Sequence, residues 1–330
     1  MDVRLQGTFR LLSPLSHIGE TIGNQTYLVQ EPILQQDGSV EEVFVYSGNA
    51  WRGQLRDLAA SYMLDALGAP QLPLDAFHLL FAGGRIGGQQ STNIEQARQF
   101  RRAIPLVSMW GGGIGNQILP GKLRVRNCYP LVFEALPVLP ARYHERAAGV
   151  SYGSVTFEKS FSRKDDSKDS RLEHHLLSAN VGADGQVALL PGDDAVPARN
   201  KRDDDVAQQM RMTVELVAPG TMLFTGIDVL DCSEIELGCL VSALHRFARS
   251  PHIGGQANRG HGLVELEYDI INLDTGEVQP FVTVRDGLPK LAPPAAEAKR
   301  AYDEYVRSVY DGYLAESGSQ VLGLLGARTA

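Results

Sequence analysis

Late in the chain the sequence reads Gly254-Gly255-Gln256-Ala257-Asn258-Arg259-Gly260-His261-Gly262 and continues into Leu263-Val264-Glu265-Leu266. Four glycines in nine residues allow backbone N–H groups to approach a ligand closely, and Asn258 and Arg259 add polar donors. This arrangement suits a phosphate, and a nucleic-acid backbone is a row of phosphates. The alternative is an ordinary glycine turn that leads into an edge strand.

The same stretch overlaps the RNP1 motif of RNA-binding RRM domains, which combines a basic residue, glycines and aromatic residues. The basic residue, Arg259, and the glycines are present. The three aromatic positions are instead occupied by His261, Leu263 and Leu266. Because aromatic side chains provide the base stacking of RRM domains, we do not expect this mode of RNA binding here.

Several further segments predict regular secondary structure. Residues 2–12 alternate partly between polar and apolar side chains, which predicts a strand. Residues 49–67 carry apolar side chains at helical spacing and predict a helix, with Asn49 as its N-cap. An apolar β-like run follows residues 217–221, and a helix-like segment then extends from Glu234 to Phe247.

Four short blocks of this sequence together resemble the RAMP superfamily of CRISPR-associated proteins. The most similar members are the backbone subunits that polymerise along guide RNA in type III and type IV effector complexes. The blocks follow the expected order between residues 15 and 262, with sparse identities between them. They are Leu15-Ser16-His17-Ile18-Gly19, Ser47-Gly48-Asn49-Ala50-Trp51-Arg52-Gly53-Gln54-Leu55-Arg56, Ala218-Pro219-Gly220-Thr221, and residues 254–262.

This resemblance implies an α+β fold, namely a ferredoxin-like/RRM-type palm with a helical finger insertion and a β-hairpin thumb. The palm would be discontinuous and formed by residues 1–67 and 206–292. Residues 68–150, which are rich in glycine and proline, would form the finger or insertion lobe. Residues 151–205 would form the thumb hairpin, and residues 293–330 a C-terminal helical tail.

The charge of the chain is unevenly distributed. Its 330 residues carry 31 Lys and Arg against 39 Asp and Glu, a net charge of −8, whereas nucleic-acid binders usually have basic surfaces. Residues 46–150, however, contain 11 basic and 6 acidic residues, a net charge of +5. A local basic stripe can bind phosphates while acidic surface elsewhere limits non-specific association. The alternative is an ordinary soluble protein with patchy charge.

We expect a cytoplasmic protein that needs no metal or other cofactor. The sequence shows neither a signal peptide nor an apolar run of transmembrane length, so no membrane is expected as a partner. Its three cysteines, Cys128, Cys232 and Cys239, lack the spacing of a metal site, and so do its histidines.

The residues expected to bind RNA come from sequence patterns and from the resemblance. Residues 121–127 alternate basic and apolar side chains, so a strand there would present its basic residues on one face; a solvated strand face fits equally well. Residues 158–205 mix both charges with few large apolar residues, which is typical of an extended hairpin or a disordered loop. The complete expected set is His17, Asn24, Gln25, Ser47, Asn49, Arg52, Arg56, Lys122, Arg124, Arg126, Lys159, Arg163, Lys164, Gly254, Gly255, Gln256, Asn258, Arg259 and His261.

The resemblance also bears on catalysis. Type III members carry an aspartate, held responsible for cleaving target RNA, in the region where this chain has Asn24 and Gln25. An amide cannot serve as a base or metal ligand in the way that a carboxylate does. Glu20 and Glu31 are the nearest acids and would substitute if the loop were shifted. The sequence also lacks the P-loop motif for binding nucleotide phosphates.

We therefore expect a non-catalytic backbone subunit of a type IV effector complex. Its partners would be CRISPR guide RNA, target nucleic acid paired to that guide, further copies of itself in a helical backbone, and other effector-complex subunits. Two alternatives stay open. One is an endoribonuclease of the same superfamily, which requires an acid near the guide. The other is a small-molecule enzyme that uses the glycine-rich loop to bind a phosphate.

Overall fold

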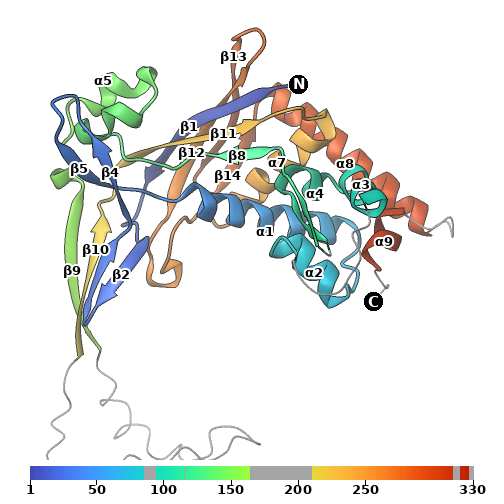
Figure 1. The fold of residues 1–330 in the computed structure, drawn as a ribbon, viewed down its shortest axis with the longest axis horizontal. Helices are drawn as coiled ribbons and strands as arrows, with labels where there is room; N and C mark the ends of the chain where they lie inside the picture. Colours follow the sequence, from blue (N-terminus) through green and yellow to red (C-terminus); the bar gives the residue numbers. More distant parts are fainter. Residues whose placement is uncertain (85–93, 115, 164–209, 315–319, 327–330) are drawn as a thin grey trace, which may run out of the picture. The chain divides into compact units, whose positions relative to one another are not determined.

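The protein has an α+β fold in the computed structural model, which describes residues 1–84, 94–114, 116–163, 210–314 and 320–326 (Figure 1). Its contacts divide the chain into two compact units. The first consists of Met1–Gly19, Leu28–Phe157 and Leu216–Ala330, and the second of Glu20–Tyr27 and Glu158–Glu215. The second unit includes the whole section with mixed charge, residues 158–205, of which residues 164–205 lie outside the described residues.

The first unit is organised around an antiparallel sheet of six strands in the order β14-β13-β12-β1-β11-β8. The predicted first strand is confirmed as β1 (Val3–Leu11), and it lies between two hydrogen-bonded neighbours. The remaining strands are β8 (Leu123–Val125), β11 (Met222–Val229), β12 (Val264–Asn272), β13 (Val278–Arg285) and β14 (Leu288–Leu291).

Two helices connect strands within this sheet. Helix α1 (Gly48–Ala66) lies in the connection from β1 to β8, and α7 (Glu234–Phe247) in the connection from β11 to β12. The predicted helix from Glu234 to Phe247 is therefore confirmed residue for residue. It begins with a capping box, in which the Ser233 and Glu236 side chains each accept a hydrogen bond from the other's backbone N–H.

The predicted N-cap of α1 is wrong by two residues. Ser47, not Asn49, caps the helix, because the Ser47 hydroxyl accepts the Asn49 backbone N–H at 3.2 Å. Gly48 occupies the first helical position, where a Cβ atom would lie 2.7 Å from the carbonyl oxygens of Val125 and Arg126. The first turn of α1 can therefore pack against the end of β8 only because residue 48 has no side chain.

Trp51 links these elements in the main core. Its indole ring packs edge-on against Phe9 of β1 and Phe247 of α7, with ring centroids 5.2 and 5.0 Å away. Its Nε1 donates a hydrogen bond to the Tyr268 hydroxyl of β12 at 3.1 Å, and that hydroxyl also bonds Thr225 of β11 at 2.7 Å. One side chain of α1 is thereby joined to three strands and a second helix.

A second, smaller core lies on the other face of the sheet. Leu223 and Phe224 are consecutive in β11 and therefore point to opposite faces; Leu223 belongs to the main core and Phe224 to the second. The second core is covered by short helical turns, η1 (Phe133–Val138), η2 (Ala141–Tyr143), α5 (His144–Ala147) and η3 (Tyr152–Ser154), and by the hairpin of β4 (Gln30–Leu34) and β5 (Val40–Phe44).

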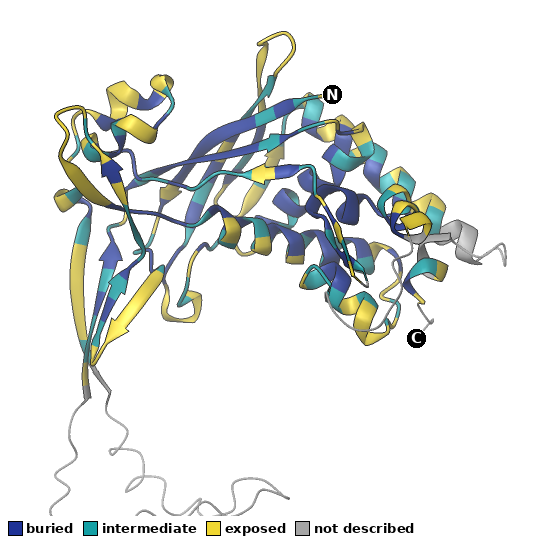
Figure 2. Ribbon diagram, viewed as in Figure 1, coloured by how far each residue is buried: buried dark blue, intermediate teal, exposed yellow. Residues whose placement is uncertain are grey.

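In its described residues, the chain between α1 and β8 carries three helices and a short hairpin. They are α2 (Leu74–Phe81), α3 (Ile94–Ala103), α4 (Pro105–Trp110), β6 (Gly112–Ile114) and β7 (Gln117–Leu119). Their buried apolar side chains belong to the main core of the first unit. Figure 2 shows which parts of the chain are buried.

The second unit contains most of a four-stranded sheet, in the order β2-β3-β10-β9. Its strands are β2 (Ile18–Ile22), β3 (Gln25–Leu28), β9 (Thr156–Arg163) and β10 (Met210–Val217). Neighbouring strands β9 and β10 flank residues 164–209 in the sequence. Residues 164–205 of the expected thumb hairpin lie outside the described residues.

The predicted C-terminal helix is present as α8 (Pro293–Leu314), followed by α9 (Gln320–Leu325). Helix α8 packs closely against α7, and Tyr302 is buried between them. At the crossing, a Cβ atom on Gly238 would lie 2.0 Å from the Ala298 carbonyl oxygen and 2.7 Å from the Tyr302 Cβ. The two helix backbones approach this closely only because residue 238 has no side chain.

We expect Gly238→Ala to lower the free energy of unfolding by about 1–3 kcal/mol, since the added methyl group forces α7 and α8 apart. Gly53→Ala is a matched control, because Gly53 is an exposed residue of α1 with no atom near its Cβ position. There we expect a gain of about 0.5–1 kcal/mol from better helix propensity. Urea unfolding of both variants tests this; a Gly238→Ala protein as stable as wild type would contradict the packing argument.

Candidate nucleic-acid interface

The glycine-rich loop is a closed structure with defined backbone hydrogen bonds. The Ile253 N–H donates to the Gly262 carbonyl at 2.9 Å, and residues Ala257–Arg259 form one 3-10 turn at the tip. Gln256 and Gly260, on either side of this turn, both have left-handed backbone conformations. The loop leads directly into β12, which lies between β13 and β1 and is therefore not an edge strand.

The structure corrects the interpretation of the loop's glycines. A Cβ atom would lie 2.4 Å from the Ser16 carbonyl oxygen at Gly254 and 2.0 Å from the Ile253 carbonyl oxygen at Gly262, and both residues have positive φ. The Gly255 and Gly262 amides already donate hydrogen bonds, to Ser16 and Pro14 respectively. Gly254 and Gly262 therefore allow the loop to pack against its own chain, and the amides of Gly255 and Gly262 are not available to a phosphate. Gly260, at the exposed tip, has open space around it.

The four sequence blocks meet where β1 ends. Leu15 forms a β-bridge with Val217, directly before the third block, and Gly220 donates its N–H to the Leu11 carbonyl. Ser16 pairs with Gly255 of the loop. These contacts join the first, third and fourth blocks around the end of β1.

The second block reaches the same place through the start of α1. The His17 Nε2 atom accepts a hydrogen bond from the Ser47 backbone N–H at 3.4 Å, and the Gln54 side chain donates to the His252 carbonyl at 2.7 Å. Burial lowers the pKa of His17, so the neutral ring that accepts this bond is favoured. His17 therefore positions the start of α1, and its ring packs edge-on against Tyr46.

The exposed part of this assembly is polar. Asn49, Asn258 and Arg259 are exposed, while Ser47 and Gln256 are half-buried. His261, by contrast, is only 7% exposed. We call the group Ser47, Asn49, Gln256, Asn258 and Arg259 the loop surface. It offers amides, a hydroxyl and one guanidinium group, which is a donor set suited to phosphate and ribose oxygens.

Two arginines of the expected set are held inside the protein. Arg56 is 6% exposed and donates to the carbonyl groups of Leu80 at 3.0 Å and of Gly111. Burial, followed by the charge of Arg52, lowers the pKa of Arg56 to about 10. Arg52 is half-buried and donates to the Trp110 carbonyl, while Trp110 donates back to the Arg52 carbonyl at 3.0 Å. Both arginines fasten the segment after α1 to the helix.

The basic strand is confirmed in part, as β8. The ion pairs there take up two of its three cations: Lys122 contacts Glu236 at 2.9 Å, and Arg126 contacts Asp228 at 2.9 Å. Arg124 is exposed. Two of the three alternating basic residues therefore pair with acidic residues of α7 and β11 and do not form a continuous external basic stripe.

The remaining expected residues lie in the second unit. Asn24 is exposed and its carbonyl accepts the Thr213 N–H, and the Gln25 side chain donates to Glu158 at 3.1 Å. Lys159 is exposed on β9, Arg163 ends that strand, and Lys164 lies outside the described residues.

Of the two acids considered for catalysis, Glu31 is engaged in structural contacts. Its carboxylate accepts the Tyr129 hydroxyl at 2.5 Å and the Asn127 side chain at 2.9 Å. Burial and this bond to Glu31 raise the pKa of Tyr129 to about 12. Glu20 is exposed. Among the described residues, no group of three or more His, Cys, Asp or Glu is placed to hold a metal ion.

Sequence reasoning missed two residues that hold the loop surface together. They are Gln54, through its side chain, and Ser16, through its carbonyl group. Both lie within recognised blocks, but nothing in the sequence pairs Gln54 with a carbonyl 198 positions away.

Within the part of the chain that the structure describes, no helix is both long enough and apolar enough to span a bilayer.

Comparisons with known proteins give one informative result. No family model matches the sequence, and no curated protein matches it. Among solved structures, a chain of a "Type IV-B CRISPR Complex" matches the fold with a TM-score of 0.54 and 18% sequence identity. The match covers 80% of this chain and 90% of that chain. At this level of identity, the result establishes that the two chains share a fold.

Proposed function

We propose that this chain is a non-catalytic backbone subunit of a type IV CRISPR effector complex. It polymerises along guide RNA, binds the RNA backbone independently of sequence, and presents the guide for pairing with target nucleic acid. The observation that carries this proposal is the meeting of four separated sequence blocks around the end of β1. The shared fold with a chain of a type IV-B complex supports it.

The topology of the main sheet supports an RRM-type palm. Its elements follow a β-α-β-β-α-β order along the chain, formed by β1, α1, β8, β11, α7 and β12. In the sheet, the four strands lie in the order β12-β1-β11-β8, and each neighbouring pair is antiparallel. This is the arrangement of a ferredoxin-like sheet. On this proposal the helices between α1 and β8 are the finger, and β9 and β10 are the base of the thumb.

The chemistry of the loop surface favours contacts with the RNA backbone. It contains no aromatic side chain for base stacking, and Arg259 is its formally charged group. A single copy would make few charged contacts, so affinity would come from many copies along one strand. The expected partners are thus guide RNA, its paired target, further copies of the chain and other effector subunits.

The proposal of a non-catalytic role rests on the side chains near residue 24. Asn24 and Gln25 provide amides, and Glu31 is committed to Tyr129 and Asn127. The rival endoribonuclease would have to use Glu20. The rival small-molecule enzyme would bind its phosphate on the loop amides, and two of these, from Gly255 and Gly262, are already hydrogen-bonded.

The first test is the dependence of RNA binding on length and salt. We expect affinity to increase from an RNA hexamer to an RNA 30-mer of any sequence. We also expect the logarithm of the binding constant to fall linearly with the logarithm of the salt concentration, because phosphates bound by the protein release counterions. Fluorescence anisotropy measures both, and electron microscopy checks for regular filaments on the longer RNA. A 30-mer that binds no more tightly than a hexamer would argue against a backbone subunit.

The second test removes the charge of the loop surface. We expect Arg259→Ala to weaken binding of the 30-mer by about 1–3 kcal/mol, the range for a charge-assisted hydrogen bond. Arg307→Ala is the matched control, because Arg307 is an exposed arginine on α8. Both variants should melt like wild type. Equal RNA affinity for the Arg259→Ala and wild-type proteins would show the loop to be a structural turn only.

The third test concerns cleavage. We expect the purified protein to leave both guide and target RNA intact in the presence of Mg²⁺ or Mn²⁺, since the region around residue 24 offers amides in place of a carboxylate. Denaturing gels of end-labelled RNA give the result. Metal-dependent fragments that disappear in a Glu20→Ala variant, with Glu41→Ala as an exposed acidic control, would instead identify an endoribonuclease.

A further inference from the structure

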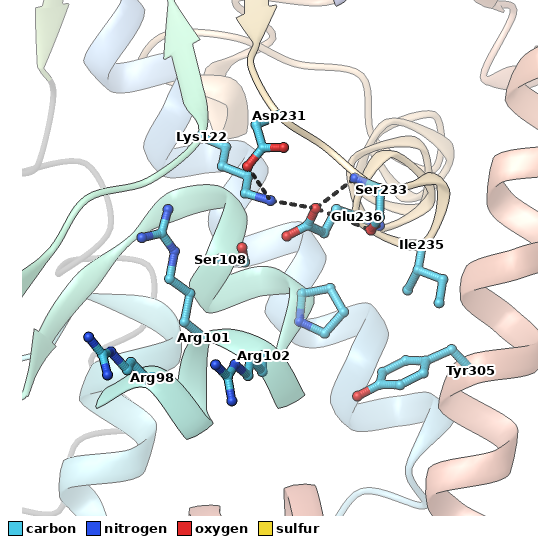
Figure 3. A pocket seen from close by; sticks show the side chains of 11 residues that line it. Arg98, Arg101, Arg102, Ser108, Lys122, Asp231, Ser233, Ile235, Glu236 and Tyr305 are labelled. Atoms are coloured by element: carbon cyan, nitrogen blue, oxygen red, sulfur yellow. Dashed lines mark hydrogen bonds and ion pairs between the residues drawn. The ribbon is translucent and has the colours of Figure 1, made fainter. Parts of the chain in front are cut away.

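A basic pocket lies at the end of α7 away from the loop surface. It has a volume of about 470 Å³, within the range of small-molecule sites, and is formed by α3, α4, α7, α8 and the residues that flank β8 and β11 (Figure 3). Helix α7 has 14 residues and is therefore about 20 Å long at 1.5 Å per residue. The pocket adjoins its first turn, whereas the loop surface follows its last turn.

Three arginines of α3 make one wall of this pocket. Arg98, Arg101 and Arg102 all line it, and Figure 3 shows them side by side along the helix. Arg98 lies 3.9 Å from Glu95 of its own helix. Within the described part of the chain, no ion pair or hydrogen bond joins the side chain of Arg101 or Arg102 to another residue. Their positive charge is thus uncompensated there by a protein carboxylate.

The acidic residues of the pocket do not neutralise these arginines. Glu236 is shared between the Lys122 ammonium at 2.9 Å and the capping box with Ser233. Burial raises the pKa of Glu236, but hydrogen bonds from Ser108, Ser233 and Lys122 outweigh it and lower the pKa overall. Glu236 is therefore an ionised partner of Lys122. Asp231, with a side chain 98% exposed, is 4.0 Å from the same lysine.

The opposite wall is apolar and contains an aromatic ring. Ile235 and Tyr305 lie across the pocket from the arginines (Figure 3). The Tyr305 hydroxyl donates to the Ala103 carbonyl at 2.5 Å, which holds the half-buried ring in place and satisfies its polar atom. A pocket with cations on one side and a fixed aromatic ring on the other matches a ligand that has an anionic group and a flat ring.

We propose that this pocket binds a nucleoside phosphate, with its phosphate on Arg101 and Arg102 and its base or ribose against Ile235 and Tyr305. Guanidinium groups suit phosphate because their N–H donors match its oxygens in pairs. A free nucleotide and one nucleotide of a strand present the same chemistry. The proposal does not depend on guide-RNA binding by the loop surface, which lies at the other end of α7.

Calorimetric titration of the full chain with adenosine 5′-monophosphate (AMP), adenosine and inorganic phosphate tests this inference. We expect AMP to bind at least tenfold more tightly than either of its parts. Arg101→Gln and Arg102→Gln should each weaken AMP binding by about tenfold or more, as the loss of a charge-assisted hydrogen bond predicts. Tyr305→Leu should weaken it as well, whereas Tyr305→Phe retains the ring and should bind AMP nearly as wild type does.

The control is Arg249→Gln, because Arg249 is an exposed arginine just beyond the far end of α7. It should leave AMP binding unchanged, and Arg259→Ala should do so too, which separates this site from the loop surface. If Arg249→Gln weakened AMP binding as much as Arg101→Gln does, the effect would come from the overall charge of the protein, and the proposal would be overturned. Inorganic phosphate binding as tightly as AMP would overturn the nucleotide assignment.

A ten-nucleotide RNA distinguishes the two sources of the nucleotide. If AMP competes with this RNA and Arg101→Gln weakens both, the pocket takes a nucleotide of a strand. If Arg101→Gln weakens AMP alone, the pocket takes a free nucleotide. The inference fails if AMP does not bind and the Arg101→Gln and Arg102→Gln proteins bind the RNA as tightly as wild type.

Discussion

The contacts of the Trp51 indole hold together the elements on which the rest of the structure depends. The ring is fully buried, touches Phe9 and Phe247, and donates a hydrogen bond to Tyr268. Gly7 of β1 is paired with Tyr268 in the sheet. A Cβ atom at Gly7 would lie 2.9 Å from the Tyr268 ring, so the ring fits there because residue 7 has no side chain. Loss of a buried tryptophan typically costs about 3–5 kcal/mol. The same contacts fix α1, β1, β12 and α7 relative to one another, and so place the loop surface.

Four basic residues of the first unit are used to build its fold. Arg52 and Arg56 hold the segment after α1 through its carbonyl groups, while Lys122 and Arg126 pair with acids around β8. A buried arginine that satisfies two carbonyl groups replaces backbone hydrogen bonds that an irregular connection cannot make for itself. This use of cations occupies four of the eleven basic residues in the section 46–150. It also restricts proposed RNA contacts to a smaller set than the sequence suggests.

The two polar surfaces of the first unit are organised by one helix. The first turn of α7 is capped by Ser233 and Glu236 and adjoins the arginine pocket, while the chain after its last turn forms the glycine-rich loop. The packing of α7 against α1 and α8 makes this helix a rigid spacer of about 20 Å between them. On the two proposals made above, a strand on the loop surface and a nucleotide in the pocket would occupy separate places on one subunit.

Local sequence determined the regular elements of this protein, and tertiary structure decided how its polar residues are used. Helix α7 matches its prediction because capping residues and apolar spacing are local signals, and the same holds for β1 and for most of α1 and α8. The N-cap prediction for α1 was wrong because Ser47 and Asn49 both suit that position locally, and only the structure shows which of them caps the helix. Likewise, Arg56 and Arg259 look alike in sequence, yet one is buried against two carbonyl groups and the other exposed. Burial and pairing depend on residues up to hundreds of positions away, so a local pattern can indicate which residues are polar but not which of them face the solvent.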